Sequence, residues 1–464
     1  MTSTTVRPDA APELRRMHHL ALLAALAAVM VPVMSFMSIN VALGEIGSDL
    51  GASPGMLQLV VAAYGVVYAA LVVIGGRLGD GYGRKRLLVI GLSAFALTSL
   101  LCSLAQSPTE LVGARLLQGV SAALVAPQVL ASLHANNDGH HRDRAIALFG
   151  ATAGVATAVA FLLGGSLAGS DLGWRSIFWI NAPIIALVLV GVVRYLPESK
   201  APSRSSLDWT GAALLGITMA LLILPLTEGR ALGWPTWTWV CLALFVVAAA
   251  VLVWWQRRLE SRGRLPLVPP SLFAFRSVSI GLGVGLPVYI TFGGFMFVYA
   301  VMAGVRHMDP LQIGVTMIPM AVAFLVTSVT SGRLVPRFGS TVLLVGSLIG
   351  AVGVAWLAYA VGQVSGALSL GDVVGPMVVF GAGLGVVWSP LMGIVLSQVP
   401  HHLAGLGGGL VITAMQAGIG LGSAVVGAVY FGWDGDFTRT GYVLGVVMVL
   451  VALLTLTLPR RSRV

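Results

Sequence analysis

Charged side chains are scarce in this sequence. Only 9% of its 464 residues are Asp, Glu, Lys or Arg, whereas about 25% is usual for soluble globular domains. The apolar content of 57% also excludes a disordered chain, which would be poor in apolar and rich in charged residues. Such a chain cannot cover the surfaces of several soluble domains, and a polytopic membrane protein is the class that remains.

Cysteine is nearly absent: Cys102 and Cys241 are the only two, and both lie in apolar runs. This excludes a disulfide framework and a CxxC metal site. Catalytic signatures such as HExxH or GxSxG are missing as well. The glycine runs at 381–385 and 405–409 lack a strand–turn–helix context and a Walker lysine, and close helix packing explains them better. We therefore expect neither an enzyme nor a bound cofactor or metal.

Long apolar runs are what the sequence has in abundance. A membrane-spanning helix needs about 20 mostly apolar residues, and fourteen runs meet that length. The expected spans are 18–43, 56–76, 87–105, 110–133, 145–168, 175–193, 208–227, 237–255, 277–302, 310–332, 340–361, 372–396, 405–431 and 441–458. The fold class that follows is an all-α integral membrane protein with fourteen transmembrane helices in a lipid bilayer.

The basic residues fall almost entirely on one side of these spans. Twenty-two of the 27 Lys and Arg residues lie in the loops of one side or near the chain ends, and one lies within a span. The four on the other side are Arg175, Arg230, Arg306 and Arg439. Because basic residues concentrate in cytoplasmic loops, we expect a multi-pass plasma-membrane protein with both termini in the cytoplasm. The net charge of +10 then needs no nucleic-acid partner.

The chain divides into two halves with an insert between them. The two longest cytoplasmic connections flank an isolated pair of spans, which indicates six spans, a two-span insert and six more. A repeat supports this division, because Gly76–Leu78 (GRL) returns as Gly332–Leu334 after 256 residues, at the same place in each half. The expected units are a tail 1–17, an N-terminal six-helix bundle 18–200, the insert with its linkers 201–276, a C-terminal six-helix bundle 277–459 and a tail 460–464.

The segment Gly75–Gly91 (GGRLGDGYGRKRLLVIG) connects the second and third spans. It resembles the signature loop of the major facilitator superfamily, G-x-L-a-D-r-x-G-r-k-x-x-l, and the matching residues are Gly76, Leu78, Asp80, Gly83, Arg84, Lys85 and Leu88. The glycines permit a tight turn, and Asp80 can pair with a basic residue near a helix N-terminus. The resemblance implies a gating and conformational role on the inner side for Gly76, Asp80, Gly83, Arg84 and Lys85.

Further segments are similar to the 14-span drug:proton antiporter branch of that superfamily. The fourth span contains ARLLQGVSAALVAPQ, like R-x-x-Q-G-x-g-a-A, and Gly173–Ile184 (GWRSIFWINAPI) resembles W-R-w-i-F-x-i-N-x-P. The resemblance implies a major facilitator fold of two six-helix bundles plus a two-helix insert. It also implies a secondary transporter that exports small, largely apolar drugs or antibiotics by alternating access, in exchange for protons, with Arg115 and Gln118 serving proton coupling.

Arg115 is also singled out by its position, because a charge within the bilayer is costly. Every Asp, Glu and His is expected at a helix end or in a loop, whereas Arg115 is expected inside a span, about one turn from its outer end. Gln118 shares its helical face. The structural alternative is that Arg115 reaches the outer interface or pairs with Glu110 or Glu45.

Two departures from that branch concern proton coupling. Where its first span usually has Asp, this sequence has Ser35, and the usual Gly-Pro of the fifth span is missing from Ala160–Gly165. The spans are then expected to lack a proton-carrying carboxylate. The alternatives to proton antiport are an uncoupled facilitator, or a membrane receptor or scaffold on a transporter fold.

The substrate cavity is expected near the midplane, between the two bundles. Its candidate lining consists of polar and aromatic residues in apolar spans: Ser35, Asn40, Tyr64, Tyr68, Gln128, Tyr289, Trp388 and Gln416. Because this set contains no acid, it suits a small molecule that is mostly apolar and neutral or weakly charged. We expect a monomer. Helix kinks or breaks are expected at Pro32, Pro127, Pro183, Pro287, Pro319 and Pro390.

Overall fold

The computed structural model describes residues 17–200, 207–366, 368–400 and 403–458. Within these ranges all regular elements are helices, and fourteen of the helical segments are long and apolar enough to span a membrane. The fourteen expected spans are therefore confirmed. The expected tails lie outside the described residues, apart from Met17.

The first half of the chain contains the elements α1 His19–Val41, α2 Leu43–Leu50, α3 Pro54–Tyr82, α4 Arg84–Ser103, α5 Pro108–Ala123, α6 Ala126–Ala135, α7 Gly139–Ala168, α8 Ser176–Trp179 and α9 Asn181–Tyr195. The pair that follows is α10 Trp209–Glu228 and α11 Thr236–Ser261. The second half contains η1 Pro270–Ala274, α12 Arg276–Val305, α13 Pro310–Ser331, α14 Val335–Phe338, α15 Thr341–Gln363, α16 Leu370–Leu396, α17 Ala404–Gly432 and α18 Phe437–Thr455.

Two of the six expected proline sites coincide with breaks. The fourth span is divided between α5 and α6 at Leu124 and Val125, directly before Pro127, and the sixth between α8 and α9 just before Pro183. Proline has no N–H to donate and is tolerated in the first turn of a helix, so the chain restarts a helix at both positions. The other four prolines lie inside continuous helices: Pro32, Pro287, Pro319 and Pro390.

The expected loop after the second span is mostly helical, which corrects the expectation of a glycine-rich turn. Helix α3 continues through Asp80 to Tyr82, α4 begins at Arg84, and only Gly83 stands between them, with φ +114°. Gly75 and Gly79 serve packing instead, because a Cβ on Gly75 would lie 2.2 Å from the Ala123 carbonyl oxygen. Gly339, 256 residues after Gly83, also has a positive φ, of +56°, so the turn of the first half recurs in the second.

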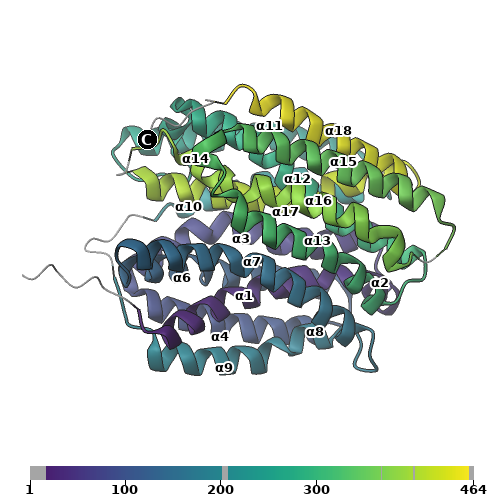
Figure 1. Cartoon of the computed structure of the whole chain (residues 1–464), viewed down its shortest axis with the longest axis horizontal. Helices are drawn as coiled ribbons and strands as arrows, with labels where there is room; N and C mark the ends of the chain where they lie inside the picture. The colour runs from purple at the N-terminus through teal and green to yellow at the C-terminus, as the bar shows by residue number, and fades with distance from the viewer. Residues whose placement is uncertain (1–16, 201–206, 367, 401–402, 459–464) are drawn as a thin grey trace, which may run out of the picture.

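The helices form two stacked groups (Figure 1), purple to teal for the first half and teal-green to yellow for the second. The groups meet along two helix pairs, α3 with α17 and α7 with α13. Glycine permits this approach: a Cβ on Gly65 would lie 2.9 Å from the Cα of Gly420, and a Cβ on Gly314 would lie 2.2 Å from the Phe161 carbonyl oxygen. A third contact lies between α2 and the end of α12, where Gly44 faces Gly304.

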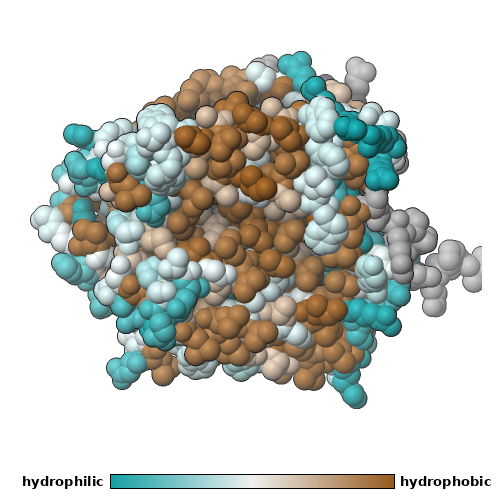
Figure 2. Space-filling model, turned by 180° about the vertical axis from the view of Figure 1, so that it is seen from behind, coloured by the Kyte–Doolittle hydropathy of each residue, from teal (hydrophilic) through white to brown (hydrophobic). Residues whose placement is uncertain are grey.

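The two inserted helices differ in their surroundings. Helix α10 packs on both α3 and α17, in an apolar cluster that includes Ala62, Met219 and Ala424. Of the 26 residues of α11, by contrast, only Thr238 and Gln256 are buried. Its apolar side chains are therefore left for lipid. Figure 2 shows a broad apolar band across one face of the molecule, with hydrophilic residues towards both ends, as a bilayer-embedded protein requires.

Candidate functional site

A buried polar network occupies the middle of the first helix group. Gln118 of α5 donates from Nε2 to Ser99 Oγ of α4 at 2.8 Å and to Ser35 Oγ of α1 at 3.3 Å. Asn181 of α9 donates to the same two hydroxyl oxygens, each at 3.4 Å. Four helices are thus joined by neutral side chains. Of these residues, Ser35 and Gln118 were expected as functional, whereas Ser99 was missed because a serine in an apolar run carries no distinctive signal.

Arg115 extends this network. Its Nη1 donates to Gln118 Oε1 at 2.6 Å, and its Nε donates to the Val60 carbonyl oxygen of α3 at 3.2 Å. The guanidinium carbon lies 4.6 Å from the centre of the Tyr64 ring, which is a cation–π contact. Its Nη2 has no hydrogen-bond partner among the described residues.

The position of Arg115 corrects two expectations. It stands two turns into α5, deeper than the single turn expected, and its side chain is 0% exposed, so it does not reach the interface. The alternative pairing with an acid is also wrong for the described residues. Glu110 accepts the backbone N–H of Gln106 at 2.8 Å, and Glu45 lies in a separate pocket beside Trp174.

Aromatic rings line the helices next to the network. Tyr64 stacks between Phe36 of α1 and Tyr68 of α3, with ring centres 5.2 and 6.0 Å away. The Tyr64 hydroxyl donates to the Pro32 carbonyl oxygen at 3.4 Å. Asn40 donates to the carbonyl oxygens of Phe36 and Met37, and its Oδ1 has no partner among the described residues.

The second helix group contributes a separate aromatic cluster. Trp388 of α16 lies edge-on to Tyr289 and Phe292 of α12, with ring centres 4.9 and 5.3 Å apart. Phe324 of α13 completes the cluster at 5.5 Å from Trp388. Gln416 is half-buried on α17, and its carbonyl oxygen belongs to the close contact with α3 at Gly65. The structure therefore brings Tyr289 and Trp388 together.

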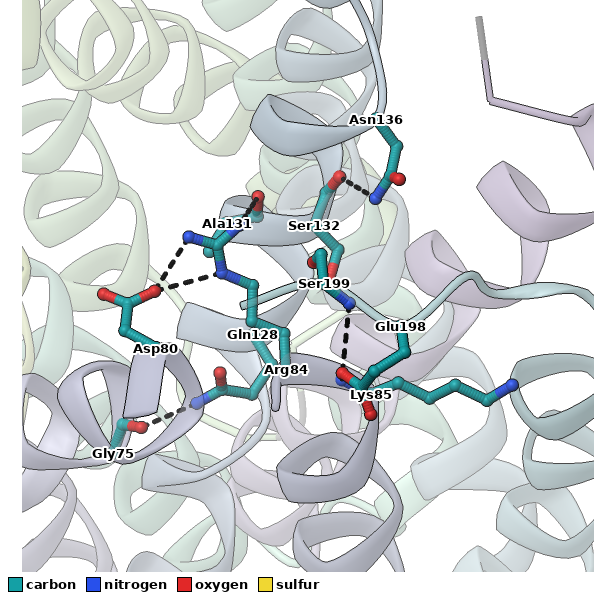
Figure 3. A network of polar contacts seen from close by, with 10 residues as sticks. All are labelled: Gly75, Asp80, Arg84, Lys85, Gln128, Ala131, Ser132, Asn136, Glu198 and Ser199. Carbon is teal, nitrogen blue, oxygen red and sulfur yellow. Dashed lines mark hydrogen bonds and ion pairs between the residues drawn. The ribbon is translucent and has the colours of Figure 1, made fainter. Parts of the chain in front are cut away.

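Asp80, Arg84 and Gln128 gather at the end of α3 (Figure 3). Arg84 donates to Asp80 Oδ1 from Nε at 3.0 Å and from Nη2 at 2.8 Å, and to the Ala131 carbonyl oxygen of α6 at 3.1 Å. Gln128 donates to the Gly75 carbonyl oxygen at 2.7 Å. Gln128 therefore lies at the α3–α6 contact beside the Asp80 pair, and not with Ser35 and Gln118.

Glu198 is a residue of this region that sequence reasoning missed. Its carboxylate accepts the backbone N–H groups of Lys85 at 3.1 Å and Arg86 at 3.3 Å, which are exposed donors in the first turn of α4 (Figure 3). Lys85 Nζ donates to the Val193 carbonyl oxygen at 2.7 Å. The only signal was a lone acid after the sixth span, among basic residues.

A second anchor joins α3 to the insert. Arg77 donates from Nη1 to the Leu265 carbonyl oxygen at 2.9 Å and from Nη2 to that of Pro266 at 2.8 Å. The neighbouring Asp208 is buried, and its carboxylate accepts four hydrogen bonds, from Gly211 N, Trp255 Nε1, Gln256 Nε2 and Leu267 N. The insert is therefore fixed to the same end of α3 that carries Asp80.

The opposite ends of the helices form a pocket of about 390 Å³, where α2 meets the segment before α8. Trp174 Nε1 donates to Asp49 Oδ2 at 3.0 Å, and Arg175 Nη1 donates to the same oxygen at 2.5 Å. These hydrogen bonds hold the pKa of Asp49 below its usual value. Burial raises the pKa of Glu45 in the same pocket. This effect outweighs the hydrogen bond from the Trp174 backbone, which lowers the pKa.

Comparison with known proteins identifies the family. The model of the Major Facilitator Superfamily matches residues 24–423 of the chain. The chain belongs to the Major Facilitator Superfamily. Because members of this family and the relatives named below are transporters, the chain is a multi-pass membrane transporter and not an enzyme.

Two relatives of this superfamily member come from species of Streptomyces. It is 36% identical to the probable actinorhodin transporter of Streptomyces coelicolor over 86% of this chain and 70% of that protein. It is 32% identical to the tetracenomycin C resistance and export protein of Streptomyces glaucescens over 89% of this chain and 76% of that protein. A solved bacterial homologue of the human drug peptide transporters matches with a TM-score of 0.68, covering 94% of this chain and 97% of that chain at 15% identity, which confirms the fold.

The fifth span of this Major Facilitator Superfamily chain keeps two glycines where it lacks the usual Gly-Pro. A Cβ on Gly164 would lie 2.7 Å from Ser38 Cβ of α1, and one on Gly165 would lie 2.7 Å from the Pro310 carbonyl oxygen of α13. One glycine therefore packs within its own bundle and the other against the opposite bundle.

The pocket at Glu45 and Asp49 predicts two opposite effects of pH. Because burial opposes ionisation of Glu45, Glu45→Gln should raise the melting temperature of the purified protein at pH 8, while its side-chain carbonyl still accepts from Trp174. The gain should vanish as the pH falls below the ordinary pKa of Glu. Asp49→Asn should lower the melting temperature at pH 8, and the loss should shrink as the pH falls through the depressed pKa of Asp49. If both variants raised the melting temperature at pH 8, or both lowered it, the opposite pKa shifts of Glu45 and Asp49 would be contradicted.

Proposed function

We propose that this chain exports small, largely apolar drugs or antibiotics across the cytoplasmic membrane by alternating access. The observation that carries the proposal is the pair of helix groups that meet through glycine at α3–α17 and α7–α13. Helices that approach closely at small residues and belong to two related halves are typical of transporters whose bundles rock against each other around a central site. The relatives named as an export protein and a transporter support the direction and the kind of cargo.

The orientation in this proposal comes from the basic residues. Because 22 of the 27 Lys and Arg residues lie on the same side of the membrane as the chain ends, both termini are cytoplasmic in this proposal. The Asp80–Arg84 pair and Glu198 then lie at the cytoplasmic ends of the helices, and the Glu45 pocket lies outside. Asp80 keeps Arg84 at the turn between α3 and α4, where a shift of α3 changes its partners. We assign the inner gate to this turn.

The proposed cargo cavity combines the two aromatic sets with the polar edge of the network. Tyr64 and Tyr68 supply it from α3, and Tyr289 and Trp388 from the second bundle. Such surfaces suit apolar ring systems, and the half-buried Met415 beside Gln416 adapts to different shapes. We propose that a single chain contains the complete transport pathway and works as a monomer.

Proton antiport is the proposed energy source, with Arg115 and Gln118 as the coupling pair. Their buried hydrogen bonds to Val60 and Ser35 span α5, α3 and α1, so a change in one helix is transmitted to the others. One observation favours a second candidate, an uncoupled facilitator or a receptor on this fold: the network among the described residues contains no carboxylate. The two experiments below separate these candidates.

The first experiment is a drug-susceptibility panel in a sensitive bacterial host. Asp80→Asn removes the charge that holds Arg84, so resistance should fall to the level of the empty vector. Asp171→Asn is the matched control, because Asp171 is exposed in the opposite-side segment after α7, and it should keep wild-type resistance. Full resistance with Asp80→Asn would refute the gate assignment. No resistance from the wild type for any compound would favour the receptor or scaffold.

The second experiment measures coupling in everted membrane vesicles. With an acidic lumen, the wild type should accumulate a resistance-panel compound above its outside concentration, and nigericin should abolish the accumulation. Arg115→Gln should equilibrate the compound without accumulating it, because the coupling pair is broken. Accumulation that survives nigericin would contradict proton antiport, and equilibration by the wild type with an intact gradient would favour the uncoupled facilitator.

A further inference from the structure

The charge of Arg115 has no counter-ion in the described part of the protein. The ion pairs identified among the described residues do not include Arg115. Its hydrogen-bond acceptors are the neutral oxygens of Val60 and Gln118, and its Nη2 has no acceptor among the residues that the structure describes. The side chain is nevertheless 0% exposed.

A guanidinium in this position is an unbalanced charge. Moving an ion from water into a protein or bilayer interior carries a large desolvation penalty, and neutral hydrogen bonds offset only part of it. Arginine stays protonated in proteins, so it cannot escape the penalty by becoming neutral. The cation–π contact with Tyr64 compensates partly. An anion at the free Nη2 would complete the site, because a charge-assisted hydrogen bond is the strongest partner that this atom can gain.

The surrounding network is neutral by composition. Ser35 Oγ accepts from both Gln118 and Asn181, and a cavity of about 20 Å³, bounded in part by Ser35, Ser38 and Asn181, lies beside it. That volume holds roughly one small molecule such as water. Gln118 bonds both Ser35 and the Arg115 guanidinium, so it links these two side chains. A carboxylate at position 35 would therefore supply the negative charge that the site lacks.

The helices that cover Arg115 also take part in the proposed motion. Val60 and Tyr64 both belong to α3, and Gly65, directly after Tyr64, is in backbone contact with Gly420 of the other bundle. A movement of α3 relative to α5 would therefore release the guanidinium from its Val60 and Tyr64 contacts. The contact of α3 with α17 at Gly65 and Gly420 can couple this shift of α3 within its own bundle to the rocking of the two bundles.

We infer that an anionic group, carried by the cargo or supplied by a chloride ion, pairs with Arg115 during the transport cycle. The inference rests on the proposed export function and narrows the cargo to acids, or to compounds that move together with chloride. The carboxylate or chloride accepts hydrogen bonds from Nη2 when α3 moves away. The cargo's apolar part then contacts the Tyr64 and Tyr68 rings.

A matched pair of probes tests the inference: 1-pyrenebutyric acid, a fluorescent carboxylate, and its methyl ester, which carries no charge. In everted vesicles in gluconate buffer, export of the acid should exceed that of the ester by about tenfold or more, the size expected for one hydrogen bond to a charged group. Repeating the assay in chloride buffer identifies the source of the anion. Rescue of ester export by chloride assigns the anion to chloride, and no rescue assigns it to the cargo.

Three variants localise the effect. Measured as initial rates of entry into the vesicles, which do not require accumulation, the preference for the acid should be lost in Arg115→Gln and partly kept in Arg115→Lys. Ser35→Asp should weaken export of the acid more than export of the ester, because an internal carboxylate then balances Arg115. Equal export of both probes in gluconate, unaffected by these variants, would overturn the inference and leave the export function standing.

A binding measurement separates this failure from failure of the export function. 1-Pyrenebutyric acid, or sodium chloride against sodium gluconate, should raise the melting temperature of the purified wild type but not of the Arg115→Gln variant. Stabilisation that depends on Arg115, without export of any compound, would refute the proposed function and leave the anion site. No stabilisation by either anion would overturn the anion site itself.

Discussion

Backbone contact between helices, made possible by glycine, is the constraint on which the rest of this structure depends. A bilayer provides no hydrophobic force between apolar helices, so their association rests on close packing. At Gly65–Gly420 and Gly314–Phe161 a single added Cβ would overlap the partner helix. These contacts determine which faces of α3, α7, α13 and α17 meet, and therefore which residues of each bundle face the shared centre.

The two bundles divide the chemistry between them. Described hydrogen bonds of Arg115, Gln118, Asn181 and Asp80 stay within the first helix group, whereas the expected cavity residues of the second group include an aromatic pair, Tyr289 and Trp388. Helix α3 connects these regions, because it carries the partners of Arg115, the Asp80 turn and the contact with α17. A displacement of this one helix alters the network and both ends of the pathway together.

The sequence predicted what depends on composition and local pattern. Fourteen spans followed from apolar length, and the turn at Gly83 followed from a local motif. The prediction that all glycines of this motif serve the turn was wrong in part, because Gly75 and Gly79 lie within α3 and pack against α5 and α6. A local sequence pattern does not reveal which helix packs against it. Glu198 was missed for the same reason, because its hydrogen bond to Lys85 joins residues 113 apart in the chain.

The proposed relative motion of the bundles is tested most directly by a reversible cross-link at the contact between Gly44 and Gly304. A Cβ on Gly44 would lie 3.6 Å from Gly304 Cα, and the reverse distance is also 3.6 Å, close enough for a disulfide. In a protein whose native cysteines, Cys102 and Cys241, are replaced by alanine, a Gly44→Cys, Gly304→Cys pair should lose export on oxidation and regain it on reduction. Undiminished export by the fully cross-linked protein would contradict a mechanism in which the two bundles separate at this end.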